Sequence, residues 1–271
     1  MFSGLKRLGF GLLSLGNLPS KQYNDAELHG VLKALEIAQI HWAGVGQGMN
    51  VVNERVVALN GQKVGFLAFC GIHGQCAETR ERPLVPTRYE SKLAAGAIEK
   101  LKSHGVVSIV VLVYWGQEHS YFPDESELVI ARQLAEYGVT LVIGYHPQGV
   151  QDHAYFGKTL VLFSLGNVLT SDEEGDFCWN KLGDVWQYSD SDPCLSVHPR
   201  MRMSVRSREQ ITRVYKIGLS RSGVAEAKYT DLAVTTEVSR PYIRRPKFNE
   251  DYRWTEVCSS SDTDCLACEP L

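Results

Sequence analysis

Three runs of β-branched and aliphatic residues dominate the middle of the chain, and each run ends in polar residues. The runs are residues 106–113, 139–143 and 159–163. Uninterrupted apolar runs of this length are typical of strands that are buried on both faces, in a sheet covered by helices. In such sheets the loops at the carboxyl ends of the strands form the ligand crevice. The polar residues after these three strands are therefore the first candidates for a functional site.

The helices before and between these strands have clear sequence signals. Asn24 with Glu27, and Asp124 with Glu127, have the spacing of a capping box, in which each side chain bonds the backbone of the other residue. An apolar period also predicts a helix over residues 90–103. Strand, helix and strand at this spacing predict right-handed crossovers between parallel strands.

Two short turns predict hairpins. Asn60-Gly61 separates strand-like residues 51–59 from residues 63–70, and Gly157-Lys158 separates two further runs. Asparagine followed by glycine is the strongest short hairpin signal. Because the glycine-rich residues 44–48 lead into this hairpin and not into an apolar helix, we reject a dinucleotide-binding fingerprint there.

The first 45 residues predict a helix end and two short strands. Residues 5–15 are apolar enough to suggest a signal peptide, but the run is short, is interrupted by glycines and lacks a small-x-small cleavage site. Strands are expected at residues 12–15 and 40–45. No apolar run reaches the roughly 20 residues of a membrane-spanning helix. The sequence leaves the compartment of the protein open.

The composition changes after the third apolar run. We expect one domain over residues 1–170, an acidic loop and a β-rich extension over 171–245, and a polar, cysteine-containing, disordered tail over 246–271. Residues 171–192 are predicted to be loop. Two antiparallel strands are expected within residues 201–234, and the alternating basic residues 200–208 indicate the solvated face of a strand.

Charge and cysteine content exclude several classes. The net charge is −3, so the chain is not expected to bind nucleic acid. The seven cysteines are an odd, scattered set that predicts no disulfide framework. Cys70, His73 and Cys76 have spacing that zinc can use, but no fourth ligand is apparent. The cysteines after residue 257 favour a local disulfide or free thiols over zinc. No nucleophile elbow or P-loop motif occurs.

Three motifs give the chain a family resemblance. They are Trp115-Gly-Gln-Glu118, the segment ending in Gly144-Tyr-His-Pro147, and Leu162-Phe-Ser-Leu-Gly-Asn167. In this order they resemble the CapA family of capsule-synthesis and poly-γ-glutamate-synthesis proteins, whose domain is similar to a calcineurin-type metallophosphoesterase. The resemblance covers residues 4–170. It implies an α/β fold of layered β-sheets flanked by helices, missing its first strands and followed by a β-rich C-terminal extension.

The resemblance also implies where a two-metal centre would lie. Such a centre needs carboxylate and imidazole ligands that hold two ions and polarise a water. Nothing precedes Met1 to supply the family's first two ligand motifs, so we expect the chain to begin partway through the domain. The remaining ligand positions fall on Leu18, Pro19, Tyr114, Tyr145 and Gln148. Leu and Pro cannot ligate an ion through their side chains, and a phenol with a pKa of about 10 is a poor ligand beside imidazole.

Several polar and aromatic residues remain as candidates for a cleft, although none is assigned as catalytic or metal-binding. A histidine at a strand end more often bonds nearby backbone than a metal. The aromatic pair at positions 114 and 115 either stacks on a sugar-like or peptide-like ligand or packs the sheet edge. Gly166 is expected to permit a bend. The candidates are Asn17, Tyr114, Trp115, Glu118, His119, Tyr145, His146, Gln148 and Asn167.

Three functional hypotheses follow. The first is a CapA-like binding or vestigial module that lacks a competent metal centre and needs no cofactor, with an anionic polymer or a small ligand as its partner. The alternative is a hydrolase of phosphate esters or of an anionic polymer that uses a pair of Mn, Zn or Fe ions. The third is a non-catalytic fragment that associates with itself through an unpaired, apolar sheet edge.

Overall fold

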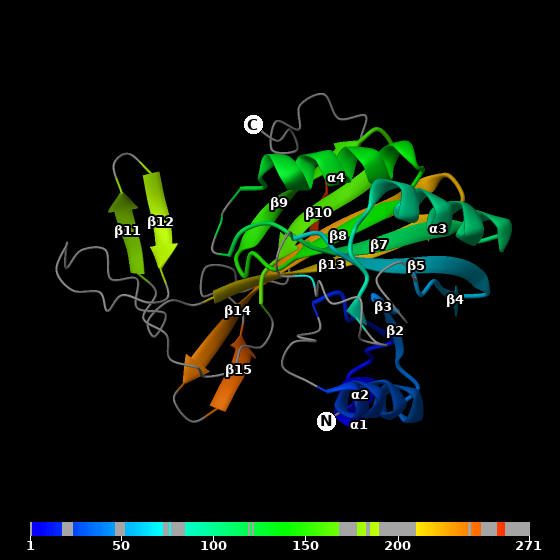
Figure 1. Ribbon diagram of the computed structural model, residues 1–271, viewed down its shortest axis with the longest axis horizontal. Coiled ribbons are helices and arrows are strands. Elements are labelled where there is room, and N and C mark those ends of the chain that lie inside the picture. Colours follow the sequence, from blue (N-terminus) through cyan, green and yellow to red (C-terminus); the bar gives the residue numbers. More distant parts are fainter. Residues whose placement is uncertain are drawn as a thin grey trace. The chain divides into compact units, whose positions relative to one another are not determined.

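A six-stranded sheet with the strand order β4-β5-β7-β8-β10-β9 lies at the centre of the computed structural model (Figure 1). The four inner strands are parallel, as the crossover spacing predicted, and the two edge strands are antiparallel to their neighbours. The strands are β4 (Arg55–Leu59), β5 (Gln62–Cys70), β7 (Ser108–Tyr114), β8 (Leu141–Tyr145), β9 (Val150–Phe156) and β10 (Thr159–Leu165).

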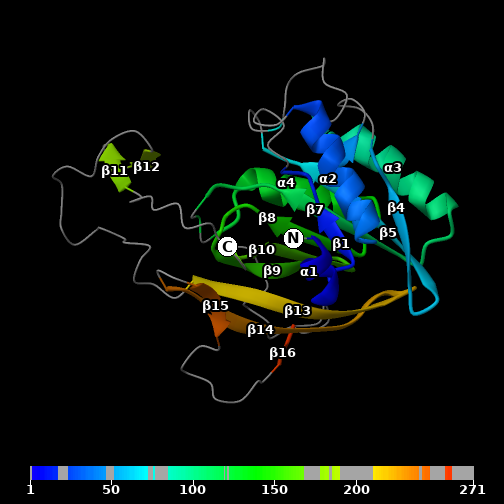
Figure 2. The same cartoon turned by 90° about the horizontal axis from the view of Figure 1, so that it is seen from below.

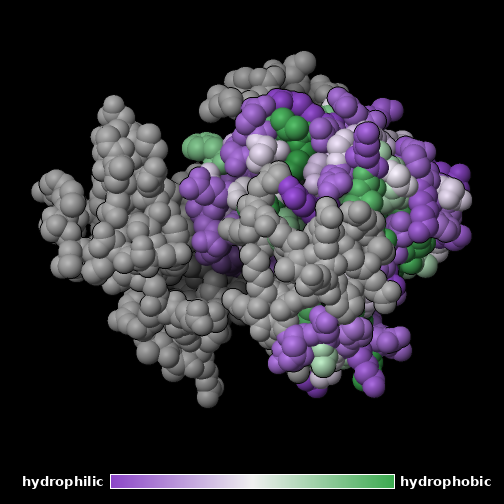
Figure 3. Space-filling model, viewed as in Figure 1, coloured by the Kyte–Doolittle hydropathy of each residue, from purple (hydrophilic) through white to green (hydrophobic). Residues whose placement is uncertain are grey.

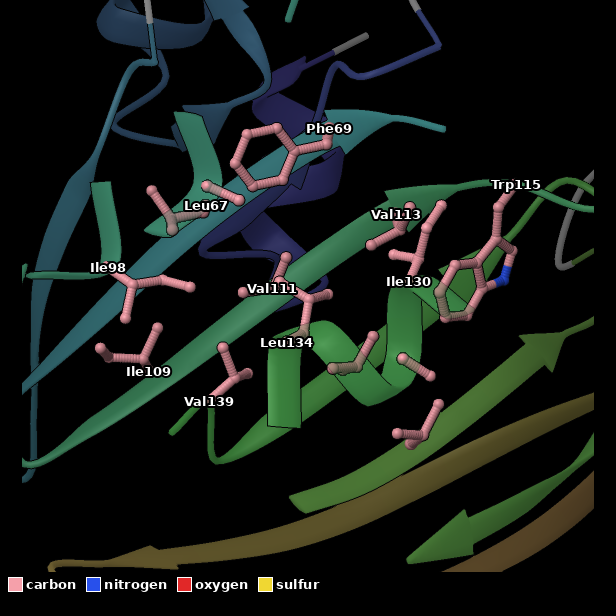
Figure 4. Packing of buried hydrophobic residues seen from close by; sticks show 14 of the residues in the cluster. Leu67, Phe69, Ile98, Ile109, Val111, Val113, Trp115, Ile130, Leu134 and Val139 are labelled. Atoms are coloured by element: carbon pink, nitrogen blue, oxygen red, sulfur yellow. The ribbon is translucent and has the colours of Figure 1, made fainter. Parts of the chain in front are cut away.

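Two helices cover one face of this sheet (Figures 1 and 2). They are α3 (Ser91–Ser103) and α4 (Glu125–Glu136). Because side chains alternate between the two faces of a strand, Ile109, Val111 and Val113 of β7 share the helix-facing side. They pack in one buried cluster with Ile98 of α3 and Leu134 of α4 (Figure 4). Each such side chain contributes roughly 1.5–3 kcal/mol by leaving water.

The opposite face of the sheet packs against β-structure from late in the sequence (Figure 2). The alternate residue of β7, Val110, is buried there with Leu160 and Leu162 of β10, against Ile217 and Ala227 of the late strands. The late strands of this layer are β13 (Gln210–Ser220), β14 (Gly223–Glu237) and β16 (Thr255–Glu256). The strand β15 (Arg240–Arg244) pairs with the later part of β14. The predicted α/β class, with layered β-sheets flanked by helices, is therefore confirmed.

The amino-terminal segment has a small core of its own. Leu28 and Leu35 of the second helix are buried with Leu15, Ile40 and Val45. Among the described strands, β1 pairs only with β2, in parallel. The elements are α1 (Phe2–Arg7), β1 (Leu12–Ser14), α2 (Asp25–Ile37), β2 (His41–Ala43) and the short antiparallel pair β3 (Val45–Gly46) and β6 (Val85–Pro86).

The chain divides into two units, the first consisting of Met1–Gly166, Arg213–Thr230 and Trp254–Leu271 and the second of Asn167–Thr212 and Asp231–Arg253. In the described part of the chain, no helix is long and apolar enough to cross a membrane. The structure describes residues 2–17, 24–46, 52–72, 76, 85–118, 120, 122–167, 178–182, 185–189, 210–237, 240–244 and 254–257. The basic residues 200–208 and His73 of the zinc hypothesis lie outside these ranges.

Two local predictions were wrong. Residues 171–192 were predicted to be loop, but they contain the antiparallel pair β11 (Cys178–Leu182) and β12 (Val185–Ser189), in which Trp179 is the register partner of Tyr188. The tail was predicted to be disordered, but β16 pairs with β14, and Lys228 forms an ion pair of 2.9 Å with Glu256. Cys70 and Cys76 form one disulfide, a pairing that the sequence analysis did not predict.

Candidate functional site

The carboxyl ends of β7 and β8 bring four predicted site residues together. Tyr114 and Tyr145 are register partners, and their ring centroids lie 5.5 Å apart. The imidazole of His146 lies against the ring of Tyr114, with 4.3 Å between the centroids. Its Nδ1 is 3.8 Å from Oε1 of Glu118. Parallel strands end at the same edge of a sheet, so motifs far apart in the sequence meet there.

Residues 14–17, at the end of β1, reach the same place. The Oγ of Ser14 and the hydroxyl of Tyr145 form a hydrogen bond of 2.7 Å. Gly16 lies so close that a Cβ added there would stand 2.9 Å from the Tyr145 hydroxyl and 3.0 Å from the Phe69 carbonyl oxygen. A side chain at position 16 would therefore push β1 away from β8. Asn17 was the residue predicted from this segment, and Ser14 was missed.

Both phenols stay protonated at neutral pH. Burial, together with the nearby carboxylate of Glu118, raises the pKa of Tyr114 to about 12. Burial also raises the pKa of Tyr145, against the opposing effect of its hydrogen bond with Ser14. The charged form of a buried group is disfavoured because it loses its hydration. The two tyrosines therefore act as neutral hydrogen-bonding groups.

The loop after β8 has an unusual backbone. His146 has a φ of +124° and Gln148 has a φ of +66°, although neither is glycine. Side chains other than glycine rarely adopt positive φ, and such strain often marks a ligand site. The His146 side chain is 5% exposed, so the strained backbone directs its ring inward, against Tyr114. The sequence motif located this loop but did not predict its conformation.

Trp115 belongs to the core. It is 1% exposed, its indole nitrogen donates to the Phe163 carbonyl oxygen at 2.9 Å, and its ring stacks on Phe163. The hypothesis that Trp115 stacks on a ligand is therefore wrong, and the packing hypothesis is confirmed for this residue. Gly144 makes room for this contact, because a Cβ there would collide with the Phe163 oxygen and the Trp115 nitrogen.

Glu127 is a buried carboxyl group that sequence reasoning recognised only as a capping residue. Its Oε2 accepts the Asp124 backbone N–H at 2.8 Å, while Oε1 has no hydrogen-bond partner within the described residues. Burial raises the pKa of Glu127 to about 7. The carboxyl group lies behind Gly116, where a Cβ would stand 2.8 Å from it. The glycine of the Trp-Gly-Gln-Glu motif thus makes room for an acid on α4.

The disulfide borders the same strand end. Cys70 is the register partner of Tyr114, and the Gly71 N–H donates to the Tyr114 carbonyl oxygen at 2.7 Å. The bond to Cys76 therefore closes a short loop directly beside the candidate site. Because both thiols are consumed by this bond, Cys70 and Cys76 are not available to zinc.

The remaining predicted residues are not gathered at this point. Asn17 is exposed on the turn after β1, and Asn167 is half-buried after β10. Gly166 has a φ of +74°, which confirms the bend predicted there. His119, Leu18 and Pro19 lie outside the described residues, so the predictions for them stay predictions.

Among the residues that the structure describes, the donors at this site do not fit a two-metal centre. Such centres are built from several carboxylates and imidazoles. Within the described residues, no group of three or more His, Cys, Asp or Glu side chains is placed to hold a metal ion. Glu118 and His146 are a single pair of suitable donors, and the neighbouring Tyr114 and Tyr145 are neutral phenols.

The fold and the site together define an α/β protein whose candidate crevice lies at the carboxyl ends of parallel strands. The family described as "Bacterial capsule synthesis protein PGA_cap" matches residues 1–172. The chain belongs to this family, as the sequence motifs predicted.

Two relatives match the same part of the chain. The PGA biosynthesis protein CapA of Bacillus subtilis (strain 168) is 21% identical over 165 residues, which are 60% of this chain and 43% of that protein. The capsule biosynthesis protein CapA of Bacillus anthracis is 25% identical over 170 residues, which are 60% of this chain and 41% of that protein. The chain thus spans less than half the length of these relatives.

Solved structures with partial likeness include two hydrolases. The calcineurin-like phosphoesterase YfkN from Bacillus subtilis has 19% identity and a TM-score of 0.41, with 70% of this chain and 64% of that chain covered. The sulfate thiohydrolase SoxB from Thermus thermophilus, in complex with glycerol, has 10% identity and a TM-score of 0.47, with 86% and 34% covered. These likenesses concern the fold alone.

Proposed function

We propose that this capsule-synthesis family chain binds its ligand without hydrolysing it, because it lacks a competent two-metal centre. The observation that carries the proposal is the pair of neutral phenols, Tyr114 and Tyr145, at positions where the family resemblance implies imidazole ligands. A neutral phenol donates one hydrogen bond and accepts others, which suits a polar ligand better than a divalent cation. The ligand class that we propose is an anionic polymer or a small ligand, in keeping with the names of the two relatives, a PGA biosynthesis protein and a capsule biosynthesis protein.

A metal-dependent hydrolase is the second candidate. It is favoured by one observation, the approach of His146 Nδ1 to Glu118 Oε1 at 3.8 Å, because imidazole and carboxylate are the usual ligands of catalytic ions. In this case further ligands would have to come from residues outside the described ranges.

One experiment separates the two functions. The purified chain is incubated with Mn²⁺ or Zn²⁺, desalted and analysed for bound metal, and its turnover of bis(p-nitrophenyl) phosphate is measured. Substoichiometric metal and no turnover above the buffer rate support the binding function. The hydrolase would be established by stoichiometric bound metal together with turnover. This turnover would be abolished by Glu118→Gln and left unchanged by Glu125→Gln, a control at an exposed position.

A further inference from the structure

A groove of about 750 Å³ lies between α2 and strands β2 and β4, and it contains none of the residues of the candidate site. Leu32 and Trp42 contribute apolar surface, and Lys33 and Arg55 contribute positive charge. Small-molecule sites typically have volumes of roughly 300–1,000 Å³ and combine apolar walls with a few polar groups. The groove therefore has the size and the mixed lining of a ligand site.

Arg55 is held in place from one side. Its guanidinium carbon lies 4.3 Å from the centroid of the Trp42 ring, and its Nε donates to the Trp42 carbonyl oxygen at 2.8 Å. Within the described residues, no hydrogen bond occupies the two terminal nitrogens of Arg55. A guanidinium group presents these nitrogens as a planar fork that matches the two oxygens of a carboxylate. Arg55 is therefore positioned in advance for an anion.

The charges around the groove favour an anion of low charge. The guanidinium group of Arg55 is partly removed from water, and this burial lowers its pKa against the opposing effect of the Glu36 carboxylate. A charge that is partly removed from water attracts an anion more strongly. Lys33 adds a positive charge, as does Lys6, whose Nζ donates to the Gln39 carbonyl oxygen at 2.7 Å. The described surface around α1 and α2 is mostly hydrophilic (Figure 3). Glu36 repels a dianion more strongly than a monoanion.

We infer that this groove binds an organic carboxylate, with the carboxylate on the guanidinium fork of Arg55 and the apolar body of the ligand along Leu32 and Trp42. Two features select this class over inorganic phosphate. The apolar walls stabilise a hydrocarbon body, which phosphate lacks. The Glu36 carboxylate in the lining opposes the second charge of phosphate. The inference does not depend on the proposed function, because none of the groove residues belongs to the Tyr114 and Tyr145 site.

The test is a titration of the ¹⁵N-labelled full chain with hexanoate. Chemical shifts of the amide and indole groups are measured at each step by transverse-relaxation-optimised NMR. We expect saturable shifts of the Trp42 indole and of the Ile40 and Arg55 amides, and at least tenfold weaker effects from 1-hexanol and from inorganic phosphate at the same pH. Lys33 is exposed, so Lys33→Glu is expected to fold normally and to weaken hexanoate binding at least threefold. The matched control Lys158→Glu makes the same charge change in the exposed β9–β10 turn, and it is expected to leave binding unchanged.

Arg55→Lys gives a second, sharper measurement. It keeps the positive charge but removes the planar fork, so we expect hexanoate binding to weaken at least fivefold. Four results would each overturn the inference: no saturable shift at these residues, binding of phosphate as tight as that of hexanoate, equal losses in Lys33→Glu and Lys158→Glu, or unchanged affinity in a folded Arg55→Lys variant.

Discussion

The Oγ of Ser14 and the hydroxyl of Tyr145 are separated by 131 positions in the sequence and by 2.7 Å in the structure. This hydrogen bond joins the end of β1 to the end of β8. It brings the residues at the end of β1 into the same site as the Gly144-Tyr-His-Pro147 motif, since each segment supplies one of the two hydroxyl groups. It also occupies the Tyr145 hydroxyl with a protein partner at a position where the resemblance implies a metal ligand.

We expect Tyr145→Phe to lower the free energy of unfolding by about 1 kcal/mol, because the half-buried Ser14 hydroxyl would lose its partner. Urea unfolding of the wild type and the variant measures this change. A double-mutant cycle with Ser14→Ala isolates the pairwise contribution. If Tyr145→Phe costs as much in the Ser14→Ala background as in the wild type, the hydrogen bond contributes nothing to stability.

The buried carboxyl group of Glu127 predicts that stability decreases as pH rises. Burial raises the pKa of Glu127 from its ordinary value of 4.5 to about 7. Between these values the folded protein keeps a proton that the unfolded chain has lost, so the free energy of unfolding falls as pH rises toward 7. The full difference amounts to about 3 kcal/mol. We expect Glu127→Gln to remove this dependence, measured by urea unfolding at pH 5 and pH 8.

Glu125→Gln is the control for this measurement. Glu125 lies two positions earlier on α4, but its side chain is 79% exposed. The control is therefore expected to follow the pH dependence of the wild type. Parallel pH profiles for wild type and Glu127→Gln would show that Glu127 titrates normally.

We expect Gly144→Ala to destabilise the protein by at least about 3 kcal/mol, because its Cβ would collide with the Phe163 oxygen and the Trp115 indole. Thermal or urea unfolding measures the loss. Gly30→Ala is the matched control, since nothing lies within 4 Å of a Cβ at this position of α2. The control is expected to stabilise the helix by roughly 0.5–1 kcal/mol. Equal stabilities for the two variants would contradict the packing described for Gly144.

Reduction of the Cys70–Cys76 disulfide is expected to lower stability by about 2 kcal/mol, because the bond closes a short loop in the unfolded chain. Unfolding with and without dithiothreitol measures the effect. The Cys70→Ser/Cys76→Ser double variant is expected to be as unstable as the reduced wild type. Dithiothreitol is expected to have no effect on its stability. Alkylation of the unreduced, denatured protein followed by mass analysis would contradict the bond if both cysteines were labelled.

Local signals in the sequence predicted much of the fold. The capping boxes of α2 and α4 form as expected. The side chains of Asn24 and Asp124 each accept the backbone N–H of the glutamate three positions later, and the side chain of that glutamate accepts the backbone N–H of the capping residue. The Asn60-Gly61 hairpin and the parallel inner strands were also predicted. These features depend on residues close in sequence or on uninterrupted apolar runs, so the sequence pattern is sufficient to identify them.

The features that were missed depend on contacts between distant segments. The Glu127 carboxyl group is buried because the first turn of α4 packs behind Gly116. The sequence around residue 127 does not indicate that Gly116 lies beside it. Ser14 joins the site only because β1 and β8 end together. The hairpin of β11 and β12 was missed because the acidic composition of this stretch suggested loop, although its aromatic residues favour strand pairing.

The Asn60-Gly61 turn has a consequence for ligand selection. Asn60 and Gly61 both have positive φ, as a two-residue hairpin turn requires, and this turn sets Arg55 opposite Phe66. Successive side chains of a strand alternate between faces, so an insertion of one residue in the turn would rotate Arg55 away from Trp42. The length of this turn therefore determines whether Arg55 faces the groove. A change in turn length would alter the ligand that we propose for the groove, even if the groove residues themselves stayed the same.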